Sequence, residues 1–320
     1  MESSLAEILG TYAGRIQEIL EDPYVTDVRV DETGIIRAKQ ALGGEHGGEY
    51  RYYGMIAPQD LQTIAYALGS EHDHDFRESS TLKTRWPGGY RTIIVLPPAV
   101  ASPILHIRKK IESVPTLEEI IASGSLSRTQ AQVMRTLLKE RRNIIIAGLP
   151  GTGKTHLQLA LCEVYEEVPW IVVIVDPLRE IEIVGKNILR VFPGPWYSEQ
   201  QALDDVLLLD PGALAYGEVR LGASGVQLIH CWLTGLSGGF CTVHAATAEG
   251  VLPRFASFYR ELGQQVVWSD LAQTIHAIAC CRFLYDEQQQ VVGRTVDLAL
   301  VHPTSAQPTG PADFRLEYIA

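Results

Sequence analysis

Residues 148–155 read GLPGTGKT and match the spacing G-x-x-x-x-G-K-[ST] in full. Glycines at this spacing let successive backbone N–H groups point inward and surround an anion. In such a loop the lysine reaches the β- and γ-phosphates of a nucleotide and the hydroxyl group ligates magnesium. We therefore predict a site for ATP or GTP with Mg²⁺. Its residues are Gly148, Leu149, Pro150, Gly151, Thr152, Gly153, Lys154, Thr155 and His156.

Three further polar residues follow short apolar runs and could act on the phosphates. Asp176 follows IVVIV, Glu218 follows ALAYG, and His244 ends GFCTVH. Ligands bind outside the carboxyl ends of strands in open α/β sheets, so all three are expected beside the loop. We predict catalytic roles for them together with Lys154, and a magnesium contact for Glu218, either direct or through water. The competing interpretation is that these are structural groups at strand ends.

The apolar runs also predict the fold that positions these groups. Residues 143–147, 170–175, 213–216 and 239–244 are typical of buried parallel strands, and helical segments separate them. Residues 117–320 are therefore expected to form an α/β domain with a parallel sheet. Residues 1–110 alternate strand and helix patterns and are expected to form a smaller α+β domain, with a linker at 111–116.

Composition indicates which partners the protein can bind and in which cellular compartment it lies. The net charge of −11 argues against a broad nucleic-acid surface, although a local basic face stays open around residues 108–110. The five cysteines lie in apolar stretches without C-x-x-C spacing, which indicates reduced thiols in the cytoplasm. The first ten residues do not have the pattern of a signal peptide, and no apolar run approaches the roughly 20 residues of a membrane span.

The order of the motifs resembles the secretion ATPases of type IV secretion and conjugation, closest to their TrbB-like branch. The resemblance rests on ILEDPYVTDVRV, GGYRTIIVLPPAVASPILHIRK, the phosphate loop, GEVR, TGLSGG and TVHA, which span most of the chain. It implies a RecA-like ATPase domain after the N-terminal domain, and a homohexamer that binds ATP between the two. Glu218 would be the Walker B acid, Asp176 part of the Asp box and His244 the His-box residue.

The same resemblance implies further groups and partners. Arg91 and Arg108 match N-terminal arginines that can approach the phosphates, and Arg220 matches the arginine of GEVR. The partners would be inner-membrane and cytoplasmic components of a secretion or conjugation machine. The protein would lie at the cytoplasmic face of the inner membrane, attached through those partners, and would not bind nucleic acid specifically.

Two segments depart from the pattern of this family. Its E-D-x-x-E box is VDPLRE here, so Val175 replaces the first acid and Glu180 comes one position late, after Arg179. Its L-R-x-R-P-D segment is LLLDPG, with Leu208 and Asp210 in place of two arginines. We therefore expect firm nucleotide binding and slow hydrolysis. The alternatives are a ring component or regulator that hardly hydrolyses ATP, and a RecA-like DNA translocase, which the acidic charge disfavours.

Overall fold

The computed structural model describes residues 4–41, 49–71, 73–109, 114–181, 183–194 and 196–320. The chain divides into two compact units, Met1–Glu112 and Ser113–Ala320. We call them unit 1 and unit 2. Residues 111–113 of the predicted linker lie outside the described residues. Within the described ranges, no helix is both long and apolar enough to cross a membrane.

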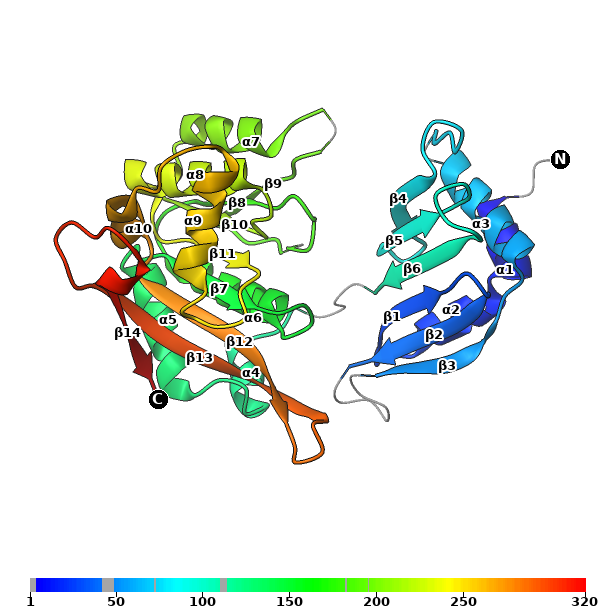
Figure 1. Ribbon diagram of the computed structural model, residues 1–320, viewed down its shortest axis with the longest axis horizontal. Helices are drawn as coiled ribbons and strands as arrows, with labels where there is room; N and C mark the ends of the chain where they lie inside the picture. The colour runs from blue at the N-terminus through cyan, green and yellow to red at the C-terminus, as the bar shows by residue number, and fades with distance from the viewer. Residues whose placement is uncertain (1–3, 42–48, 72, 110–113, 182, 195) are drawn as a thin grey trace. The chain divides into compact units, whose positions relative to one another are not determined.

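Unit 1 is a six-stranded antiparallel sheet with helices on one face (Figure 1). The strand order is β3-β2-β1-β6-β5-β4. The strands are β1 (Val25–Val30), β2 (Ile35–Gln40), β3 (Tyr50–Met55), β4 (Thr81–Trp86), β5 (Tyr90–Val95) and β6 (Ile104–Arg108). The helices are α1 (Leu5–Tyr12), α2 (Gly14–Glu21) and α3 (Pro58–Ser70).

The core of unit 1 forms where the apolar stripe of each helix meets the inner face of the sheet. Leu9, Ile16 and Leu61 belong to one buried cluster with Ile36 and Ile107 of the strands. Strands β1 and β2 pair as a hairpin, and Asp31 accepts hydrogen bonds from the backbone of its turn.

Unit 2 is built on parallel strands, as predicted, with an antiparallel extension at one edge. One sheet has the order β10-β8-β9 and the other β11-β7-β12-β13-β14, and a parallel bridge between Glu218 and Thr242 joins them. The parallel strands are β7 (Ile144–Gly148), β8 (Val172–Val175), β9 (Ile188–Val191), β10 (Ala213–Tyr216), β11 (Phe240–Val243) and β12 (Ala277–Tyr285). The antiparallel strands are β13 (Val291–Pro303) and β14 (Phe314–Ile319).

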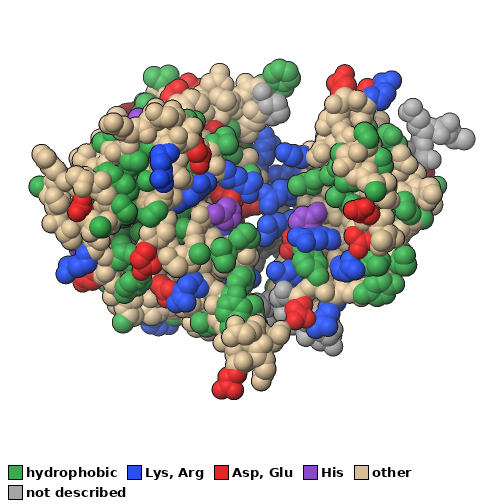
Figure 2. Space-filling model, in the orientation of Figure 1, with side chains coloured by type: hydrophobic (Ala, Val, Ile, Leu, Met, Phe, Trp, Pro, Cys, Tyr) green, Lys and Arg blue, Asp and Glu red, His purple; other side chains and the backbone are tan. Residues whose placement is uncertain are grey.

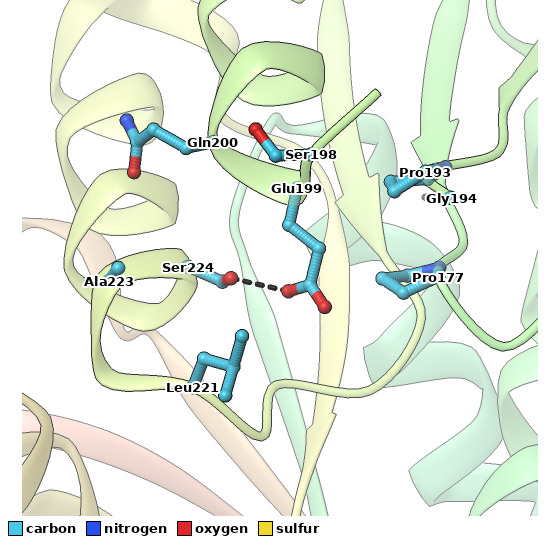
Figure 3. Close-up of a pocket in the computed structure, with 9 residues that line it drawn as sticks. All are labelled: Pro177, Pro193, Gly194, Ser198, Glu199, Gln200, Leu221, Ala223 and Ser224. Atoms are coloured by element: carbon cyan, nitrogen blue, oxygen red, sulfur yellow. Dashed lines mark hydrogen bonds between the residues drawn. The ribbon is translucent and has the colours of Figure 1, made fainter. Parts of the chain in front are cut away.

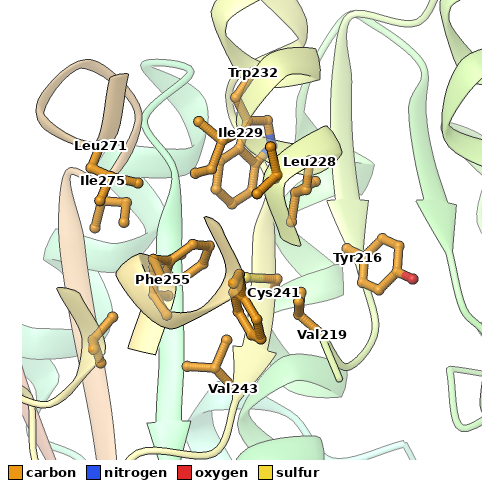
Figure 4. Packing of buried hydrophobic residues seen from close by; sticks show 14 of the residues in the cluster. Tyr216, Val219, Leu228, Ile229, Trp232, Cys241, Val243, Phe255, Leu271 and Ile275 are labelled. Carbon is orange, nitrogen blue, oxygen red and sulfur yellow. The ribbon is translucent and has the colours of Figure 1, made fainter. Parts of the chain in front are cut away.

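Helices pack on this sheet and bury its side chains. They are α4 (Leu117–Ala122), α5 (Arg128–Lys139), α6 (Lys154–Leu161), α7 (Glu199–Val206), α8 (Gly222–Cys231), α9 (Val251–Glu261) and α10 (Trp268–Thr274). Trp232, Phe255 and Val243 belong to one buried cluster (Figure 4), and the Trp232 indole donates to the Leu214 carbonyl at 2.9 Å. A capping box of Ser127 and Gln130 begins α5. All five cysteines are buried and unpaired.

Candidate active site

The loop at 148–155 connects β7 to α6 in a conformation that its glycines make possible. Gly148, Gly151 and Gly153 have φ of +148°, +82° and +101°, values that side-chain-bearing residues rarely adopt. A Cβ atom on Gly148 would also lie 2.5 Å from the Cys281 carbonyl oxygen. The sequence therefore folds into a loop whose N–H groups can surround an anion at the start of α6.

Two side chains at the start of α6 carry the chemistry expected of this loop. Lys154 is 7% exposed, and its ammonium donates to the carbonyls of Gly148 at 2.9 Å and Leu149 at 3.0 Å. The Thr155 hydroxyl donates to a Glu180 carboxylate oxygen at 3.2 Å. A hydroxyl beside a carboxylate offers the oxygen ligands that Mg²⁺ prefers.

The contact with Glu180 shows where the altered E-D-x-x-E box places its last acid, which comes one position late in the sequence. Arg179 has a left-handed backbone with φ of +54°, and its guanidinium lies over the Phe192 ring, 5.4 Å from the centroid. VDPLRE has one residue more than the E-D-x-x-E spacing, and the left-handed turn at Arg179 accommodates it. Arg179 therefore does not take the place of the acid, and the Glu180 carboxylate lies at Thr155.

Hydrogen bonds to the Asp176 side chain stabilise the loop that contains Glu180. This side chain is buried and accepts from the backbone N–H groups of Leu178 at 3.2 Å and Ile181 at 2.7 Å. Burial, with the Glu180 charge, raises the pKa of Asp176 despite these N–H donors. The Asp176 carboxylate thus bonds to its own loop, whereas Glu180, which we did not predict as a site residue, accepts from the Thr155 hydroxyl.

Glu218 and His244 meet at the ends of neighbouring strands, as predicted. The Glu218 carboxylate accepts from Arg220 Nε at 2.6 Å and Nη2 at 3.2 Å, and lies 3.0 Å from His244 Nε2. Burial acts to raise the pKa of Glu218, but the Arg220 hydrogen bonds and the His244 and Lys154 charges outweigh it and lower the pKa. Glu218 is therefore ionised at neutral pH and close enough to Lys154 to interact with it electrostatically.

A buried glutamine fixes the strand end that carries Glu218. Gln158, on α6, is 2% exposed, and its amide donates to the carbonyls of Tyr216 and Gly217, both at 2.9 Å. Thr242 also donates to the Gly217 carbonyl, at 3.0 Å. We did not predict Gln158. Its signal in the sequence is a polar residue on the inward face of an otherwise apolar helix.

A pocket of about 410 Å³ adjoins the site between the loop after Asp176 and the start of α8 (Figure 3). Pro177 and Leu221, which directly follow Asp176 and Arg220, line it. The Glu199 carboxylate accepts from the Ser224 and Tyr216 hydroxyls here. These bonds tie the starts of α7 and α8 to the end of β10.

The remaining predicted residues lie apart from this cluster or in unit 1. His156 lies on the exposed side of α6, where desolvation and the Arg294 charge lower its pKa. Arg91 and Arg108 are direct register partners on β5 and β6 of unit 1. Their approach to a nucleotide stays a prediction.

Leu208 and Asp210, which replace two arginines of the family pattern, lie at the opposite edge of the sheet from the phosphate loop. They precede β10, at the edge of the sheet where its parallel strands begin, whereas the phosphate-binding loop follows the end of β7. Arg141 occupies the same edge and donates to the carbonyls of Gly212 and Gly235. Replacing arginines at 208 and 210 therefore removes no cation from the phosphate loop of the same unit.

Parallel strands, a glycine-rich loop with Lys154 and Thr155, and acids at the neighbouring strand ends together define a RecA-like P-loop ATPase, which follows an α+β unit. Residues 81–311 match the family described as "Type II/IV secretion system protein", and the chain belongs to that family. The expected resemblance to type IV secretion and conjugal-transfer ATPases is confirmed.

Two relatives and one solved structure illustrate the similarity. The chain is 32% identical over 263 residues to the probable conjugal transfer protein TrbB of Sinorhizobium fredii, covering 81% of this chain and 79% of that one. It is 30% identical over 221 residues to the conjugal transfer protein TrbB of Rhizobium radiobacter, covering 68% and 67%. The structure of the Legionella pneumophila ATPase DotB matches with a TM-score of 0.63 at 14% identity, over 91% of this chain and 80% of that one, which is a likeness of fold.

Proposed function

We propose that this protein is an ATP-hydrolysing motor of a conjugation or type IV secretion machine, powering pilus assembly or substrate transfer. The observation that carries the proposal is the convergence of Lys154, Thr155, Glu180, Glu218 and His244 at one edge of the sheet. Membership of the secretion family supports the setting.

Each group has a role that follows from its contacts. The loop N–H groups and Lys154 bind the phosphates, and Thr155 with Glu180 and Glu218 offers oxygen ligands to Mg²⁺, directly or through water. Bound magnesium would neutralise charge that develops on the phosphates. Ionised Glu218 orients the attacking water, and His244, which is in contact with it, senses whether the γ-phosphate is present.

The proposed assembly is a homohexamer in which Arg91 and Arg108 approach the nucleotide. It would act at the cytoplasmic face of the inner membrane, bound to membrane and cytoplasmic components of the machine. The mass of the full chain with and without ATP and Mg²⁺ tests this assembly. A hexamer stabilised by nucleotide supports it, and a persistent monomer contradicts it.

Phosphate release with Mg²⁺ tests the activity. Wild type should release phosphate, whereas Lys154→Ala and Glu218→Gln should not, and the exposed Lys186→Ala should match wild type. Equal rates in wild type and Lys154→Ala would refute the proposal.

One observation favours a second candidate, a ring component that binds ATP with little hydrolysis. Arg220 and His244 both engage Glu218, so the carboxylate must exchange these partners before it can orient water. Firm binding of a fluorescent ADP without turnover, in wild type and in Arg220→Ala, would favour this candidate. Turnover that Glu218→Gln abolishes would exclude it.

A further inference from the structure

The face of the unit 1 sheet opposite its helices carries two rows of side chains that cross all six strands. The strand registers define the rows directly. The first row is Arg85, Arg91, Arg108, Asp27, Lys39 and Tyr50. The second row is Lys83, Ile93, His106, Arg29, Arg37 and Tyr52.

Contacts between the rows show that their side chains share this face. The Arg29 guanidinium lies over the Tyr50 ring at 4.5 Å, and His106 Nε2 lies 3.1 Å from a carboxylate oxygen of Asp27. The alternate residues Val28 and Ile107 point to the helices and are buried. We call the twelve residues of the two rows the basic face.

The basic face concentrates positive charge in an acidic protein. It holds seven lysines or arginines and one carboxylate, whereas the whole chain has a net charge of −11. Figure 2 shows Lys and Arg side chains in blue along the sheet side of unit 1. The expectation of no broad nucleic-acid surface rested on net charge, which averages over faces of opposite sign, and it left a local basic face open around residues 108–110.

We propose that the basic face binds the backbone of a single-stranded nucleic acid. Strand spacing gives the face a length of about 24 Å, and its two rows lie about 7 Å apart. Tyr50 lies at one end with Tyr52, which is 65% exposed, and such rings can stack on bases. A cationic surface with aromatic rings fits a single strand, because the rings can stack on unpaired bases, whereas in a duplex the bases stack on one another.

The site extends beyond the arginines that the proposed function assigns to ATP. Arg91 and Arg108 lie on β5 and β6, whereas Arg29, Lys39 and Tyr52 lie on β1, β2 and β3. Substitutions on β1–β3 therefore test the nucleic-acid site while leaving the assigned ATP contacts in place.

Fluorescence anisotropy of a labelled oligo(dT) over a range of salt concentrations, with the full chain, tests the proposal. Wild type should bind with a linear dependence of log K on log salt. The double variant Arg29→Ala/Lys39→Ala should reduce the steepness of that line by about 1.4, since each lost phosphate contact contributes about 0.7. Tyr52→Ala should weaken binding about 5- to 150-fold.

Matched controls separate the face from overall charge. Arg51→Ala/Arg77→Ala removes the same charge, but Arg51 pairs with Ala38 in the intervening register and Arg77 lies in the loop after α3. Tyr66→Ala removes a half-exposed tyrosine from α3. Both controls should bind oligo(dT) as wild type does.

Three results would overturn the proposal: binding that does not respond to salt, an equal loss in the control pair, or tighter binding of phosphatidylglycerol vesicles or polyglutamate than of oligo(dT). Lys154→Ala should bind oligo(dT) normally while failing to release phosphate. A failure of the ATPase proposal is thereby distinguishable from a failure of this one.

Discussion

Acidification should destabilise unit 2 through His276, which directly precedes strand β12. His276 Nδ1 accepts from the backbone N–H of Asn143 at 3.1 Å, next to the first residue of β7. Burial, with the charge of Arg142, lowers the pKa of His276 from 6.5 to about 4. A protonated imidazole would present an N–H group to the Asn143 N–H and lose this hydrogen bond.

The sign and size of the effect follow from the two pKa values. The unfolded chain takes up the proton near pH 6.5, and the folded chain only near pH 4, so stability falls as the pH drops between these values. At pH 5 the full shift corresponds to about 2 kcal/mol. The imidazole is only partly buried, so solvent screening reduces the expected loss to about 1 kcal/mol.

Urea unfolding at pH 7.5 and pH 5.0 measures this loss. His276→Gln keeps a hydrogen-bond acceptor but cannot titrate in this range, so wild type should lose about 1 kcal/mol more than the variant on acidification. His230→Gln, at an exposed position on α8, should behave as wild type. Equal pH dependence in wild type and His276→Gln would refute the argument.

Three further predictions concern the site. Glu180→Ala should slow phosphate release about 10- to 100-fold, because Mg²⁺ loses an oxygen partner beside Thr155; a wild-type rate would contradict the role given to its carboxylate. Gln158→Leu should lower the free energy of unfolding by about 1–3 kcal/mol, measured in urea, because buried carbonyls lose a donor. Gly217→Ala places a Cβ atom 2.9 Å from Asp176 Oδ1 and should reduce both stability and phosphate release, whereas Gly194→Ala, with no atom within 4 Å, should change neither.

The sequence predicted the parts of the fold that local patterns determine. The apolar runs before the phosphate loop, Asp176 and Glu218 became β7, β8 and β10, because a strand buried on both faces needs an uninterrupted apolar run. The strands after residue 276 were missed, since their side chains alternate between buried and exposed only in part.

The site was harder to predict where backbone geometry, and not spacing, sets the position of a side chain. A fixed spacing from Asp176 put Arg179 in the place of the acid, but one left-handed residue lets Glu180 reach Thr155. Similarly, we expected slow hydrolysis because arginines are missing at 208 and 210. These positions precede β10, so they lie at the edge where the parallel strands begin, whereas the phosphate loop lies at the edge where they end.

The basic face also bears on how unit 1 avoids joining to itself. A six-stranded sheet with helices on only one side leaves a broad face that a second sheet could cover. Two copies meeting face to face would bring seven cations against seven, and this repulsion disfavours stacking. The positive charge that attracts an anionic partner therefore also disfavours stacking of this sheet on another copy. The effect weakens at high salt, because salt shortens the range of the repulsion.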